Sequence, residues 1–94
     1  MSKYRRTVII GFKPLPEDIE ELLLQGFLYV DHVNEEEFMK HYRWYIDQWK
    51  LHGIQCVIVD SHVDIPEDIL EKLKKQFKVY RERAMHPLKL YIEV

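Results

Sequence analysis

Acids and histidines with the potential for chemistry gather after two apolar segments of the chain. They are Asp31 and His32 after the first of these segments, then Asp60, His62 and Asp64 after the second. Histidine beside carboxylates binds divalent cations or transfers protons. The spacing Asp-x-His-x-Asp matches no ligand signature that names a metal, so the sequence assigns no metal site.

The second cluster has a natural place for a ligand. Open parallel sheets bind ligands beyond the carboxyl ends of their strands, where the strand order reverses. There Lys13, Asp60, His62 and Asp64 would line a crevice, which gives one hypothesis: a small metal-dependent hydrolase or a nucleotide-binding protein. The competing interpretation is structural, because Asp64 precedes Ile65-Pro66, where an acid would cap the next helix. We favour the structural interpretation.

Other signals for catalysis are incomplete. Ser61 lacks the Gly-x-Ser-x-Gly elbow, and Gly11 lacks the further glycines of a phosphate-binding loop. Cys56 lies within an apolar run and is expected in the core rather than as a nucleophile. We therefore expect a non-enzymatic protein with no catalytic residue and no cofactor.

These residues need a scaffold, and the apolar pattern predicts one. Residues 7–12 and 54–59 are apolar at consecutive positions, as in strands buried on both faces. Pro16-Glu17-Asp18, Asn34 with Glu37, and Pro66-Glu67-Asp68 each have the form of a helix start. The order is β-α-β-α-β-α-β-β: an α/β domain with a mostly parallel sheet, strand order 2-1-3-4-5, and an antiparallel last strand.

An internal repeat supports this arrangement. Residues 16–27 and 66–77 are identical at seven of twelve positions, a shift of 66 − 16 = 50. Two interpretations stay open: a duplicated βαβ unit, or two generic helix starts of the Pro-acid-acid-Ile type.

Composition limits the class of protein. At 94 residues, with 47% hydrophobic and 32% charged residues, residues 1–94 are expected to form one domain. The apolar runs are too short to span a membrane, and a lone cysteine suits a cytoplasmic protein.

A net charge of −2 argues against a dedicated nucleic-acid binder. One stretch is basic, with aromatic Phe77 and Tyr80 interleaved: Lys72, Lys74, Lys75, Lys78, Arg81 and Arg83. Nearby Glu71 and Glu82 dilute its charge, so we interpret it as a solvated surface.

The predicted binding surface is apolar instead. One helix covers one face of the predicted sheet and two cover the other, which leaves apolar surface exposed. Leu24 lies off the core side of its helix, and its repeat counterpart is Lys74. Trp44 and Leu51 form a second stripe on the long helix. The sequence thus predicts a protein-interaction module that docks on a protein or forms homodimers through Leu24, Trp44 and Leu51.

Overall fold

Five strands form one sheet in the order β2-β1-β3-β4-β5 in the computed structural model, which describes residues 3–85 and 88–94. The elements are β1 (Arg5–Ile10), α1 (Pro16–Leu24), β2 (Phe27–Val33), α2 (Glu35–Leu51), β3 (Cys56–Val59), α3 (Glu67–Gln76), β4 (Lys78–Met85) and β5 (Leu88–Glu93). All neighbouring strands are parallel except β4 and β5, which are antiparallel. The predicted α/β fold and strand order are confirmed.

The central position of β1 and β3 follows from their sequences. The side chains of Val8, Ile9 and Ile10 are inaccessible to solvent although neighbouring residues point to opposite faces of the sheet. Val57 and Ile58 in β3 behave in the same way. Only a strand covered on both faces requires apolar residues at successive positions.

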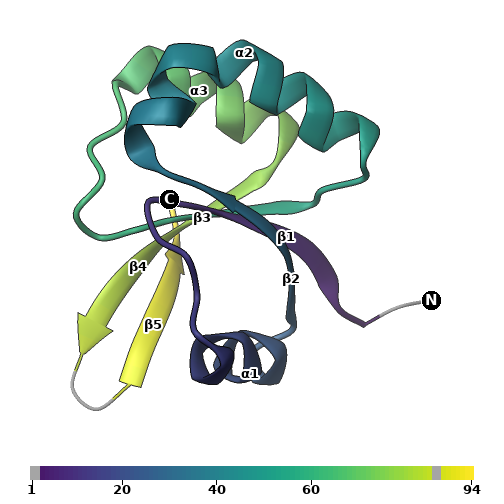
Figure 1. The fold of residues 1–94 in the computed structure, drawn as a ribbon, viewed down its shortest axis with the longest axis vertical. Coiled ribbons are helices and arrows are strands. Elements are labelled where there is room, and N and C mark those ends of the chain that lie inside the picture. Colours follow the sequence, from purple (N-terminus) through teal and green to yellow (C-terminus); the bar gives the residue numbers. More distant parts are fainter. Residues whose placement is uncertain (1–2, 86–87) are drawn as a thin grey trace.

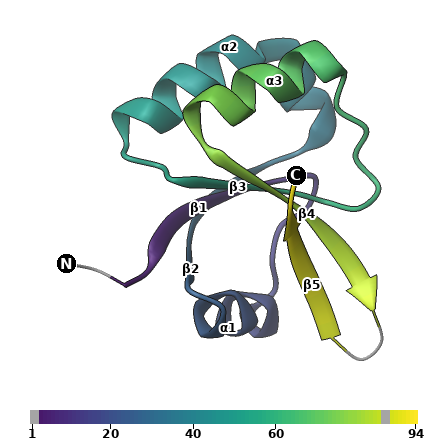
Figure 2. The same ribbon diagram turned by 180° about the vertical axis from the view of Figure 1, so that it is seen from behind.

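The sheet separates two cores. α1 covers one face, and α2 and α3 lie side by side over the other (Figures 1 and 2). On the α2–α3 side, Phe38, Ile46 and Trp49 of α2 pack with Leu73 of α3. On the α1 side, Leu22 packs with Phe27, Ile58 and Tyr80. Because α1 alone covers this face, large side chains from the strands, such as Phe27 and Tyr80, fill much of this core.

The three helices differ in the side-chain hydrogen bonds at their starts. Asn34 Oδ1 accepts a hydrogen bond of 2.7 Å from the Glu37 amide, so the predicted cap of α2 is confirmed. In α1, Asp18 Oδ2 accepts from the Leu15 amide at 2.9 Å. α3 begins after Pro66 without a side-chain cap, so the suggestion that Asp64 caps this helix was wrong.

Two boundaries differ from the expected ones. β2 continues to Val33, so Asp31 and His32 belong to a strand rather than to a following loop. The spacing of Leu15, Ile19, Leu22 and Leu23 in the sequence predicts that all four face the core, yet Leu15 is exposed because it precedes the first helical turn. The predicted turn at residues 85–87 lies partly outside the described residues.

Candidate functional site

The loops that follow β1 and β3 contact each other directly. Gly11 has a φ of +115°, and a Cβ atom placed on it would lie 2.5 Å from Val63 Cγ2 and 2.7 Å from Asp60 Cβ. Only glycine combines this backbone angle with so close an approach. The point between β1 and β3, where the sequence predicted a crevice, is therefore packed.

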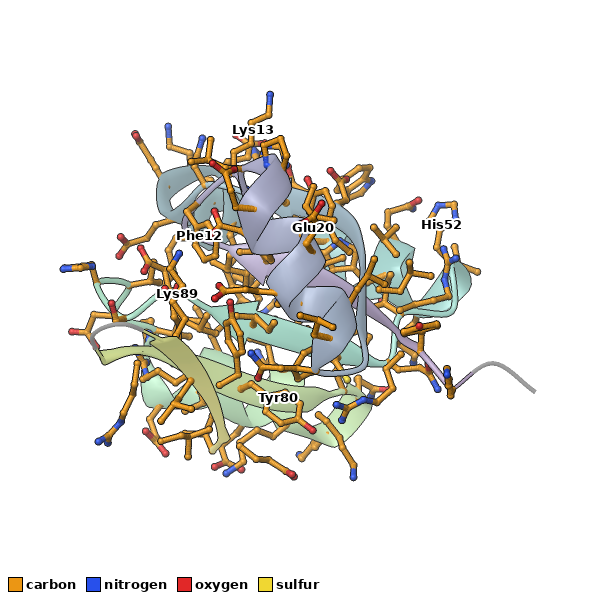
Figure 3. The ribbon with its side chains drawn as sticks, turned by 90° about the horizontal axis from the view of Figure 1, so that it is seen from below. Phe12, Lys13, Glu20, His52, Tyr80 and Lys89 are labelled. Carbon is orange, nitrogen blue, oxygen red and sulfur yellow. The ribbon has the colours of Figure 1, made fainter. Side chains whose placement is uncertain are left out.

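The four residues predicted for that crevice do not converge on one site. Lys13 and Asp64 are exposed, and the His62 side chain is 90% exposed with its Nδ1 3.8 Å from Asp60 Oδ1. Figure 3 shows Lys13 at the periphery of the molecule. Across residues 3–85 and 88–94, no group of three or more His, Cys, Asp or Glu side chains is placed to hold a metal ion.

Lys13 instead borders a hollow of about 400 Å³ beyond the carboxyl ends of β1 and β2. Its other polar lining residues are His32, Asn34, Glu37 and Tyr45, and it includes none of the three predicted partners of Lys13. The Tyr29 hydroxyl lies 2.7 Å from His32 Nδ1, and the Tyr45 hydroxyl donates to Glu37 Oε1 at 3.2 Å. The imidazole and the carboxylate are thus each bound to a tyrosine.

Burial and these contacts raise the pKa values of Tyr29 and Tyr45. Burial is the main reason that the pKa of Tyr45 is raised, and the hydrogen bond with Glu37 adds to it. The pKa of Tyr29 is raised by burial and by the charge of Asp31. Both phenols therefore stay protonated and act as hydrogen-bond donors or acceptors, not as bases.

A second polar cluster lies on the α1 side of the sheet. Lys89 Nζ of β5 is 3.1 Å from Asp18 Oδ1 of α1 and 3.5 Å from Glu82 Oε1 of β4. The same ammonium lies 5.2 Å from the centre of the Phe12 ring, and both residues are labelled beside α1 in Figure 3. Asp60, at the end of β3, adds a negative charge that acts on Glu82.

The electrostatics of this cluster follow from its burial. Glu82 is only 5% exposed, and its Oε2 has no hydrogen-bond partner among the residues that the structure describes. Burial raises the pKa of Glu82 and the charge of Asp60 adds to this, whereas Lys89 acts in the opposite direction. For Asp18, burial acts to raise the pKa, but the Leu15 amide and Lys89 outweigh it and the pKa is lowered. The Tyr91 hydroxyl is buried nearby without a partner in the described part of the chain, and burial strongly raises its pKa.

This cluster joins elements rather than exposing reactive groups. Lys89 neutralises carboxylates from two other elements and so connects the β4–β5 hairpin to the first turn of α1. Sequence reasoning missed it because Asp18 was explained by the helix dipole alone. The signal was the alternation in residues 88–94, which places Lys89 and Tyr91 on one face of the strand.

No family model, curated protein or solved structure gives a significant match to this chain. Function must therefore be inferred from its own surfaces. None of the helices described has both the length and the apolar character of a bilayer span. The lone cysteine, Cys56, is buried in β3, and burial raises its pKa, so it is a core residue.

The residues predicted to bind a partner occupy two sides of the molecule. Leu24 is 87% exposed, Trp44 58% and Leu51 78%. α1 and α2 cover opposite faces of the sheet (Figure 1), so Leu24 lies away from the other two. The structure thus gives two separate candidate surfaces instead of one.

The surface around Leu24 is concave. A hollow of about 550 Å³ is lined by Lys3, Tyr4, Glu20, Leu23, Leu24 and Gly26. Apolar side chains from α1 and from the segment before β1 form its centre, and Lys3 and Glu20 supply opposite charges. A shallow apolar depression with both charge signs is suited to protein contact.

Proposed function

We propose that this chain is a non-enzymatic protein-interaction module that self-associates through the Leu24 surface, the hollow defined above. The observation that carries the proposal is the almost complete exposure of Leu24, which lines an apolar hollow. Burying leucine in a contact removes apolar area from water, which is the main favourable term in most protein association.

The charges around the hollow favour a second copy as the partner. A twofold interface brings the same patch of two chains together, so the patch must complement itself. Lys3 and Glu20 supply one positive and one negative group beside the same apolar centre. Two such surfaces related by a twofold axis can therefore match unlike charges.

A comparison of the two βα units supports the same conclusion. Lys74 of α3 occupies the position equivalent to Leu24 when residues 16–27 are aligned with residues 66–77. Lys74 is exposed on α3, so a helix of this type tolerates a charged residue there. Trp44 and Leu51 on α2 remain proposed as a second contact surface.

The test is the solution mass of the wild-type chain over a range of concentrations, by size-exclusion chromatography with light scattering. We expect the mass to rise with concentration above 11.5 kDa for the wild type. Leu24→Lys should abolish the rise, because an unpaired ammonium in a contact is costly. Lys74→Leu is the matched control and should leave the mass unchanged, and all variants should melt near the wild-type temperature. A monomer at every concentration, or a dimer that Leu24→Lys does not weaken, contradicts the proposal.

A further inference from the structure

Charge is distributed unevenly in this molecule despite its small net charge. α1, α2 and α3 each link parallel strands, so all three begin at the carboxyl ends of the strands and finish at the amino ends. The charged residues in the first turns of the three helices are all acidic: Glu17, Asp18, Glu35, Glu36, Glu37, Glu67 and Asp68. The last turns of α2 and α3 carry Lys50, Lys74 and Lys75. One end of the sheet is thus acidic, and the other end is basic on the α2–α3 side.

Two adjoining hollows lie at this basic end. The first, of about 340 Å³, is lined by Arg43, Ile46, Asp47, Lys72, Lys75 and Gln76. The second, of about 510 Å³, is lined by residues 74–78 together with Arg5 and residues 54–56. Lys75 and Gln76 line both hollows, so the two adjoin at these residues. Asp47 is the only acid in either lining.

A third hollow extends the path along α2. It is lined by five consecutive residues, 40–44, and shares Arg43 with the first hollow. Consecutive side chains on a regular helix point about 100° apart and do not share a surface. α2 departs from helical geometry at His41, with φ −132° and ψ 31°, inside this segment. This kink explains how five consecutive residues can line one hollow. Lys40 and Trp44 thereby join the residues that line the three hollows.

The three joined hollows, which we call the basic track, contain cations that are free to bind an anion. In the described part of the chain, no carboxylate forms an ion pair with Arg43, Lys72, Lys74, Lys75 or Lys78. Lys40 pairs with Glu36 at 3.5 Å in an exposed contact, and Arg5 donates to the Tyr80 hydroxyl. Lys74 and Lys75 lie in the last turn of α3, where positive charge interacts favourably with the helix dipole. Arg43 and Lys72 lie outside the last turns of their helices and have no such role.

Aromatic side chains accompany these cations. Trp44 is 58% exposed, with its ring edge-on to Tyr45 at a centroid distance of 5.0 Å. Lys72 and Arg43 lie 5.3 and 5.8 Å from the Tyr42 ring centre. A hydrogen bond with Arg43 is the main reason that the pKa of Tyr42 is lowered, and the charges of Arg43 and Lys72 add to it, whereas burial acts in the opposite direction. More than half of the Trp44 side chain is accessible, and it lines one hollow with Lys40 and Arg43.

The tertiary structure removes one of the two acids that the sequence placed beside the basic stretch, whereas Glu71 stays exposed on α3. Glu82, expected to dilute the basic stretch, is buried on the α1 side against Lys89. The aromatics within that stretch, Phe77 and Tyr80, are buried as well. Arg81 donates to the Val63 carbonyl at 2.9 Å, near the acidic end. The exposed aromatic ring of the track, Trp44, comes from α2 instead, so the basic track combines two helices.

We infer that the basic track binds single-stranded nucleic acid, with phosphates along Arg43, Lys72, Lys75 and Lys78 and an unpaired base stacked on Trp44. Grooves of positive charge with exposed aromatic rings bind single strands, because every base has a face available for stacking. A duplex buries the faces of its bases, so it would contact only the positive charges of the track. The helices that carry Arg43, Lys72, Lys75 and Trp44 lie across the sheet from α1 and Leu24, so binding at these residues does not depend on self-association through Leu24.

The test is fluorescence anisotropy of labelled twelve-residue oligonucleotides with the whole chain: oligo-dT, oligo-U and a DNA duplex. We expect both single strands to bind more tightly than the duplex, with log K falling linearly with log salt at a slope of about −2 to −3 for three or four neutralised phosphates. A preference for oligo-U or for oligo-dT identifies the natural strand as RNA or DNA. Tighter binding of the duplex, no binding at low salt, or binding that salt does not weaken overturns the inference.

Matched variants locate the site. Trp44→Ala should raise the dissociation constant roughly 5- to 150-fold through loss of stacking, whereas Leu51→Ala on the same helix should not change it. Lys75→Ala should reduce the salt slope by about 0.7, and Lys13→Ala at the acidic end should leave it unchanged. Leu24→Lys should retain full nucleic-acid binding, which separates this result from the test of self-association. Equal effects of Lys75→Ala and Lys13→Ala, or a Trp44→Ala variant that loses only self-association, overturn the inference.

Discussion

Lys89 Nζ in β5 lies 3.1 Å from Asp18 Oδ1 in α1, although the two residues are 71 positions apart in the chain. This ion pair joins the C-terminal hairpin to the only helix on its face of the sheet. Asp18 also accepts a hydrogen bond from the Leu15 amide, so one carboxylate holds both the start of α1 and the hairpin.

Replacement of Asp18 should therefore reduce stability in a pH-dependent way. Asp18→Asn should lower the free energy of unfolding at pH 7 by about 1–3 kcal/mol, as for hydrogen bonds to charged groups. Because the folded-state pKa of Asp18 is lowered, its contribution is present above the unfolded value of about 3.9 and is lost as pH falls through the folded value. Urea denaturation of both proteins should converge in acid. Asp68→Asn, at the repeat-equivalent position in α3, is the control and should cost little; an Asp18→Asn deficit that persists in acid would argue against the ion pair.

Gly11 should be the least replaceable of the described glycines. Gly11→Ala should cost about 2–5 kcal/mol, from backbone strain at positive φ plus overpacking against Val63 and Asp60. Gly53 also has a positive φ, but the nearest atom to a Cβ there is 4.0 Å away. Gly53→Ala should therefore cost only about 1–2 kcal/mol. Thermal melts of the two variants compare them directly, and equal losses would show that the loops after β1 and β3 do not touch as described.

Asn34 and Asp64 provide a second matched pair, since the sequence suggested a cap at both positions. Asn34→Ala should destabilise the protein by about 0.5–2 kcal/mol through loss of its bond to the Glu37 amide. Asp64→Ala should change stability by less than about 0.5 kcal/mol, because α3 has no side-chain cap. Denaturant midpoints measure both effects, and a larger loss for Asp64→Ala would place the start of α3 differently.

Local patterns were enough to predict the order of the elements and the topology of this chain. Consecutive apolar residues in β1 and β3 require cover on both faces, and right-handed crossovers then leave few strand orders. The cap at Asn34 was equally readable, because donor and acceptor lie three residues apart. Such features depend on neighbours in the sequence, so the sequence alone determines them.

The meeting of distant side chains was decided by the tertiary structure. Glu82 and Phe77 belong to a basic stretch in the sequence, yet packing buries both of them, and α2 supplies Trp44 to the basic track instead. Asp60 was grouped with His62 by spacing, and the two side chains lie 3.8 Å apart, but Asp60 also raises the pKa of Glu82 while His62 is 90% exposed. Each of these relationships depends on how strands and helices from separate parts of the chain are rotated and stacked. Periodicity and spacing carry no information on that geometry, because it is set by the packing of the whole core.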